Sequence, residues 1–125
     1  MSRIRIAWKS GEVIGSLSDT PTARALLAAL PVEASANTWG EEVYFALPVT
    51  AKLEAGAMQV VEAGAVCFWV QGHALALPFG ATPVSKGAEC RLVTPCNVVG
   101  KIEGDPRRLA GVRDGDTIRV TLAES

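Results

Sequence analysis

The chain has 125 residues, of which 49% are hydrophobic and 20% charged, and its formal net charge is −1 at pH 7. This length suits one domain that buries its own core, so we expect a single domain over residues 1–125. The near-neutral charge gives no electrostatic reason to expect a nucleic-acid partner or an anionic membrane surface, and no apolar run is long enough to span a bilayer.

The composition also bears on compartment and assembly. Three cysteines are a sparse, odd set, which favours free thiols in a reducing compartment. The first residues read directly into a strand and lack the apolar region of a signal peptide, so we expect a cytoplasmic protein. The mean hydropathy of +0.25 is slightly apolar, which leaves surface for a homo-oligomer or for an enzyme subunit as partner.

The N-terminal third predicts a hairpin followed by a helix. Arg3–Lys9 alternates apolar and basic residues, and Glu12–Leu17 returns as a second strand after a Ser-Gly turn. Thr20 is placed as a helix N-cap, and the apolar residues that follow recur at helical spacing until Pro31 ends the helix.

The rest of the chain predicts short strands. They are Glu42–Leu47, Val66–Val70, Ala74–Phe79, Cys96–Glu103 and Thr117–Leu122, with a loop at Gly80–Gly87 and helical turns at Pro106–Val112. About eight strands with two short helices in a chain of this size indicate a mainly β fold, a closed β-barrel capped by helices.

The segment Asn37–Phe45 combines large aromatic residues, two carboxylates and an amide beside Gly40. In the strand that follows this glycine, Val43 and Phe45 point to one face and Glu42 and Tyr44 to the other. One face is therefore expected in the core, while the other carries groups that stack or hydrogen-bond. We interpret this segment as the wall of a pocket.

Residues of other common sites are sparse. His73 is the only histidine and falls in a turn, and the spacing of Cys67, Cys90 and Cys96 lacks the short hairpins that usually hold zinc. Cys67 lies in an apolar strand and is best explained as core. No phosphate loop, dinucleotide fingerprint or nucleophile elbow is present. We therefore expect no metal and no cofactor.

Three motifs carry a resemblance to a known family. They are N-T-W-G-E-E-V-Y-F at Asn37–Phe45, F-G-A-T-P at Phe79–Pro83 and N-V-V-G-K-I at Asn97–Ile102. The chain resembles the small bacterial and archaeal cyclophilin-like proteins of uncharacterised function. The late region, with its strand, Glu-Gly turn, short helix and closing strand, is also similar to cyclophilins. The resemblance implies the cyclophilin-like barrel.

The departures from proline isomerases imply a different activity. The resemblance would place an arginine in the strand after the first helix, but no arginine or lysine lies between Arg24 and Lys52. Cys96 stands where those enzymes carry a histidine. A forked cationic donor cannot be replaced by Trp39 or Glu41. The resemblance therefore implies the fold without isomerase activity.

We accordingly expect a protein that binds a small molecule or a short peptide in a pocket. Two alternatives stay open: a peptidyl-prolyl isomerase, and an accessory subunit of an amide-hydrolysing or oxoprolinase-type enzyme, an assembly in which cyclophilin-like modules also occur. The candidate ligand-binding residues, which the barrel order could bring to one surface, are Asn37, Thr38, Trp39, Glu41, Tyr44, Phe79, Thr82, Pro83, Cys96 and Asn97.

Overall fold

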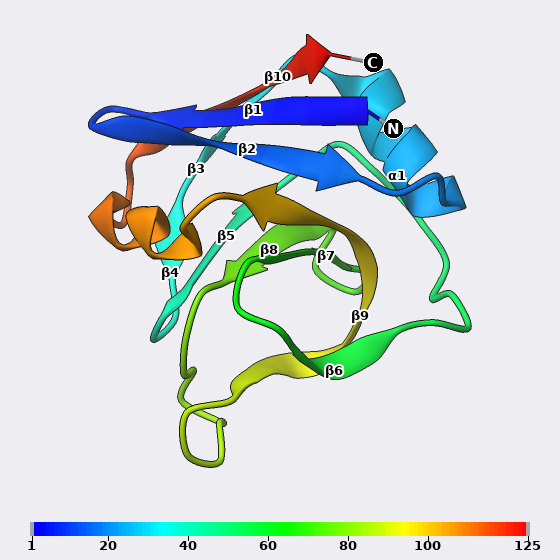
Figure 1. Ribbon diagram of the computed structural model, residues 1–125. Helices are drawn as coiled ribbons and strands as arrows, with labels where there is room; N and C mark the ends of the chain where they lie inside the picture. The colour runs from blue at the N-terminus through cyan, green and yellow to red at the C-terminus, as the bar shows by residue number, and fades with distance from the viewer. Residues whose placement is uncertain (1, 125) are drawn as a thin grey trace.

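The computed structural model describes residues 2–124, which form ten β-strands, one α-helix and one 3₁₀-helix (Figure 1). The prediction of a mainly β fold with two short helices is confirmed. The strands are β1 (Ser2–Trp8), β2 (Gly11–Leu17), β3 (Val32–Ser35), β4 (Asn37–Thr38), β5 (Glu42–Ala46), β6 (Met58–Val61), β7 (Ala65–Trp69), β8 (Ala74–Pro78), β9 (Cys90–Glu103) and β10 (Thr117–Glu124), and the helices are α1 (Pro21–Ala29) and η1 (Pro106–Gly111).

The N-terminal elements follow the sequence pattern closely. β1 and β2 form the expected antiparallel hairpin, and Ile4 and Ile6 are fully buried on its inner face. In α1 the Thr20 hydroxyl accepts the N–H of Ala23 at 3.1 Å, so this threonine is the N-cap. Leu26 extends from the helix into the main core.

The expectation of a closed barrel of about eight strands was wrong in both respects. The ten strands run in the hydrogen-bonded order β3-β10-β1-β2-β9-β7-β8-β5-β4, with β6 attached to β9, and the sheet does not close. β3 pairs with β10, whereas β4, which follows after Ala36, pairs with β5. One extended segment thus changes partner midway. β3 and β4 are the two edges of the sheet and follow one another in the chain, but no hydrogen bonds pair them. The covalent chain therefore connects the two edges.

Strands β5, β7 and β8 are buried on both faces. Their inner face supplies Phe45, Phe68 and Leu75 to the main core, which also receives the inner faces of β1, β2 and β10. Their outer face contributes to a second, smaller core that includes Cys67 and Ala76. Strands that are covered on both sides explain why β7 and β8 read as almost continuous apolar runs.

Strand β9 builds the cover of this second core. Its second half pairs with β2 and β7, whereas its first half leaves them and pairs with β6. Figure 1 shows β6 and the first half of β9 crossing below β7 and β8. Leu92 and Cys96 point from this part of β9 into the second core and are buried. The candidate site lies in the space that remains here.

Candidate functional site: an aromatic pocket around Glu42

A pocket of about 210 Å³ opens between the outer face of β5, β7 and β8 and the first half of β9. It is lined by one acidic residue, three aromatic residues and four smaller apolar ones. These residues are Trp39, Glu42, Tyr44, Trp69, Ala76, Leu92, Val93 and Cys96.

The β alternation of β5 creates the floor of the pocket. Val43 and Phe45 are buried in the main core, so Glu42 and Tyr44 must point to the opposite face. Tyr44 lies opposite Ala76 of β8 in the antiparallel register. Because alanine fills little space beside the tyrosine ring, this cross-strand pair leaves a hollow that a larger side chain would occupy.

Trp39 is held at the pocket by a tight turn. Its backbone N–H donates to the carbonyl of Glu42 at 3.0 Å. Gly40 follows with φ +61°, and a Cβ on it would lie only 2.9 Å from the Ala81 carbonyl oxygen and from the Thr82 Cα. Only glycine tolerates both the backbone conformation and this close approach. Gly40 thereby fixes the half-buried Trp39 side chain on the pocket wall.

Trp69 forms the opposite aromatic wall. A Cβ on Gly72 would come within 2.2 Å of the Trp69 ring, so the absence of a side chain at residue 72 lets the ring pack directly on the turn after β7. Its ring meets that of Tyr44 edge-on, with centroids 6.3 Å apart and planes at 86°. Within the described part of the chain, the buried indole Nε1–H of Trp69 has no hydrogen-bond partner.

Glu42 is the only charged residue on the pocket wall. The residue is 6% exposed, and its buried Oε1 atom has no hydrogen-bond partner among residues 2–124. Removal from water disfavours the carboxylate form and raises the pKa of Glu42 from 4.5 to about 7. Two buried polar atoms without partners, Glu42 Oε1 and Trp69 Nε1, thus belong to residues that line one cavity. Such atoms are costly unless a bound molecule or water satisfies them.

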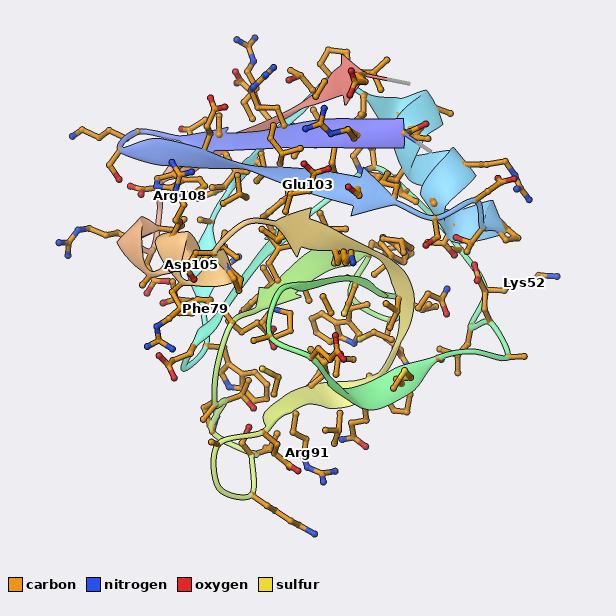
Figure 2. All side chains as sticks on the ribbon, viewed as in Figure 1. Lys52, Phe79, Arg91, Glu103, Asp105 and Arg108 are labelled. Carbon is orange, nitrogen blue, oxygen red and sulfur yellow. The ribbon has the colours of Figure 1, made fainter. Side chains whose placement is uncertain are left out.

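The basic residues of the neighbourhood do not supply a counter-ion for Glu42. None of the residues that line the pocket is Lys, Arg or His. Arg91, on β9, is paired with Glu89, and Figure 2 shows Lys52 extending away from the molecule. The neighbouring carboxylate, Glu41, faces elsewhere and lies 3.7 Å from Arg107.

The cysteines around the pocket are not activated. Cys67, Cys90 and Cys96 are all buried and free. Burial raises the pKa of each thiol, to about 12 for Cys96, and the nearby Glu42 carboxylate adds to the rise. These thiols therefore stay protonated near neutral pH. Within residues 2–124, no cluster of three or more His, Cys, Asp and Glu residues is arranged to hold a metal ion.

The structure brings three of the sequence-predicted site residues into the pocket: Trp39, Tyr44 and Cys96. Asn37 and Thr38 lie nearby in β4 but are exposed. The hydroxyl of Thr38 donates to Asp114 at 2.8 Å. Thr38 thus ties β4 to the segment before β10, while Asn37 Nδ2 donates to the Tyr44 carbonyl at 3.4 Å.

The other predicted residues lie outside the pocket. Glu41 accepts the N–H of Ala81, Phe79 is buried in the main core, and Thr82 hydrogen-bonds Ser85 and the carbonyl of Arg91. Pro83 is exposed in the same loop.

Asn97 has a structural role in the interior. Its Nδ2 donates to the Thr22 hydroxyl at 2.9 Å and to the Lys52 carbonyl at 2.8 Å, while its Oδ1 accepts the N–H of Glu54 at 2.8 Å. This 1% exposed side chain joins β9 to α1 and to the loop before β6.

The residues that the predicted site omitted are Glu42, Trp69, Ala76, Leu92 and Val93. The alternation of β5 already placed Glu42 on the same face as Tyr44, and that signal was sufficient to include it. Leu92 and Val93 lie in a part of β9 that was not predicted as a strand, so no sequence signal placed them opposite β5.

Comparison with known proteins identifies the family. A family model described as cyclophilin-like matches residues 2–121, nearly the whole chain, and the chain therefore belongs to the cyclophilin-like family. The resemblance that the three sequence motifs suggested is thereby confirmed.

A solved structure is similar over the same length. It is the solution structure of the hypothetical protein AF2241 from Archaeoglobus fulgidus, with 38% sequence identity and a TM-score of 0.84 over 98% of this chain and 95% of that chain. A search of curated proteins found no match. Among residues 2–124, no helix has the length and apolar character needed to cross a membrane.

Proposed function

We propose that this protein binds a small molecule in the pocket around Glu42 and that it is not a proline isomerase. The observation that carries the proposal is the Glu42 carboxyl, which is buried in an aromatic-lined cavity with an oxygen that lacks a partner. A carboxyl kept in such a place costs folding free energy, and a ligand that pairs with it recovers part of that cost.

The dimensions of the pocket set the size of the ligand. An engineered protein cavity of about 150 Å³ binds benzene. A pocket of about 210 Å³ therefore suits a molecule of similar or slightly larger size. A longer molecule, such as a peptide, has room to place only one side chain in a pocket of this volume.

Isomerase activity is disfavoured by the chemistry of the wall. Catalysis of prolyl isomerisation in the related enzymes uses an arginine, and the pocket presents a carboxyl instead. An isolated carboxyl supplies no forked cationic donor to a prolyl amide. In a prolyl-peptide isomerisation assay we expect no acceleration at catalytic protein concentrations, and acceleration at such concentrations would overturn this part of the proposal.

The binding site itself is tested by an NMR fragment screen. The indole N–H signals of Trp8, Trp39 and Trp69 are separate reporters in ¹⁵N-labelled protein. Trp39 and Trp69 line the pocket, whereas Trp8 belongs to the main core, where its Nε1 donates to the Ser10 hydroxyl at 3.1 Å. We expect fragments that bind to move the signals of Trp39 and Trp69 and to leave that of Trp8 in place.

A matched variant completes the test. Ala76→Leu places a larger side chain on the pocket floor, and the hits of the screen should lose binding to it. Fragments that bind this variant as well as the wild type, or that move only signals away from the pocket, would contradict the proposed site.

A further inference from the structure

The pocket concentrates the electron-rich aromatic residues of the chain. The protein has three tryptophans, one tyrosine and three phenylalanines. The tyrosine and two of the tryptophans line the pocket, while all three phenylalanines are buried in the main core. Trp and Tyr attract a cation more strongly than an aliphatic wall does, and Trp is the best aromatic residue for this purpose. The aromatic content of the pocket therefore favours a ligand with positive charge.

The carboxyl of Glu42 points to the same charge. It is the only acidic group among the lining residues, and no basic side chain of the lining accompanies it. Of the nearby cations, Arg91 pairs with Glu89 and Arg107 lies beside Glu41, so neither is offered to Glu42. Among residues 2–124 these side chains leave Glu42 without a cation, so a counter-ion for its carboxylate form would come with the ligand. A buried carboxylate needs an oppositely charged partner, because an isolated charge in an apolar cavity is strongly disfavoured.

The arrangement of the walls suits a compact cation. Tyr44 and Trp69 both line the pocket and their rings meet at 86°, and Trp39 supplies a third aromatic side chain. Carbon-substituted ammonium groups are apolar outside and charged at the centre, which matches an aromatic enclosure that ends in a carboxylate.

We propose that the pocket binds a small organic ammonium ion, with Glu42 as its counter-ion and Trp39, Tyr44 and Trp69 as its aromatic walls. This inference rests on the proposed function, because it names the ligand class of the same site.

The test compares two probes that differ in charge alone. Choline and 3,3-dimethylbutan-1-ol have the same shape, with nitrogen in one replaced by carbon in the other, and both are small enough for about 210 Å³. We expect choline to bind at least about tenfold more tightly in titrations followed by the Trp39 and Trp69 indole signals.

Two glutamate variants assign the counter-ion. Glu42→Gln should remove the advantage of choline over its neutral analogue, whereas Glu41→Gln should retain it, because the Glu41 side chain lies outside the pocket beside Arg107. Choline keeps its charge at every pH, so its affinity should also fall below pH 7, as Glu42 becomes protonated, and level off at that of the neutral analogue. The other titratable residues of the lining are Tyr44 and Cys96, and Cys67 and Cys90 are buried in the neighbouring strands. Burial raises the pKa of each thiol, so the three thiols stay protonated in that range.

The outcomes separate this inference from the proposed function. Equal binding of the two probes at the indole signals, or a choline preference that survives Glu42→Gln, would overturn the ammonium inference and leave the pocket as a binding site. Binding of neither probe would also overturn the inference, and the fragment screen would then decide the proposed function independently. If Glu42→Gln does not fold, the comparison of the two probes on the wild-type protein still decides the charge preference.

Discussion

Replacement of Glu42 by glutamine should remove a loss of stability that the wild type undergoes as the pH rises from 4.5 to about 7. The carboxyl is buried, so its pKa rises from 4.5 to about 7 in the folded state. At 1.36 kcal/mol per pKa unit, this rise corresponds to ~3 kcal/mol. Between pH 4.5 and about 7 the folded protein holds a proton on Glu42 that the unfolded chain has lost.

The sign of the effect follows from this proton. Stability falls with increasing pH wherever the folded state binds more protons than the unfolded state. The cost of desolvating the Glu42 charge is therefore absent well below pH 4.5, grows through the interval and is complete above pH 7. Glutamine has no charge to desolvate, so the Glu42→Gln variant lacks this contribution at every pH.

The assay is urea denaturation of the wild type and the variant at several pH values from 4.5 to 8. The difference in the free energy of unfolding between the two should change by ~3 kcal/mol across this range, in favour of the variant at pH 8. Glu62→Gln is the control, because Glu62 is exposed in the turn before β7, and its curve should stay parallel to that of the wild type. Parallel curves for Glu42→Gln would refute the reasoning, since they would mean that the carboxyl is not desolvated.

Three further predictions concern the walls of the pocket. Trp39→Ala should remain folded, with a loss of unfolding free energy below the ~3–5 kcal/mol expected for a fully buried aromatic residue, and should no longer bind the fragments of the screen. Trp69→Ala removes the ring that packs on Gly72, so thermal melts should show that it is the more destabilising of the two substitutions. Gly40→Ala should lower the free energy of unfolding by ~2 kcal/mol or more in chemical denaturation, because Gly40 has a positive φ and a Cβ on it would lie 2.9 Å from the Ala81 carbonyl oxygen. Gly87 has φ +68° but open space around it, so Gly87→Ala should show only the part of this loss that comes from the backbone conformation. Ala76→Leu should keep or raise the melting temperature while it fills the cavity, and a fall of several degrees would mean that the hollow beside Tyr44 is smaller than described.

Local patterns allowed the sequence to predict most of the scaffold. The hairpin of β1 and β2, the N-cap of α1 and the alternation of β5 each depend on side chains close together in the chain. The alternation also separated the core face, with Phe45, from the pocket face, with Tyr44. One wall of the pocket was therefore predictable before any tertiary contact was known.

The rest depended on contacts between distant segments. β3 and β4 have four and two residues, too few for a clear alternation, so the partner change that leaves the sheet unclosed was not visible. The first half of β9 contains Thr94 and Pro95 among its apolar residues and resembles a loop. Its role as the cover of the pocket arises from pairing with β6, which local propensity does not encode.

The choice between the two neighbouring glutamates illustrates the same limit. Glu41 and Glu42 have the same chemistry, and the register with β8, in which Glu42 lies opposite Pro78, decides which of them is buried. Three sequence motifs were expected to share one surface. The structure uses Thr82 and Asn97 to support loops and the interior, because both are buried and satisfied by backbone and hydroxyl partners.

A crystal structure of the protein with the best fragment of the screen tests the central claim most directly. We expect electron density for the fragment between the rings of Trp39, Tyr44 and Trp69, with a polar atom within hydrogen-bond distance of the Glu42 carboxyl. Density in another depression instead, such as the groove along Ser16 and Lys101, with the space around Glu42 filled only by solvent, would contradict it.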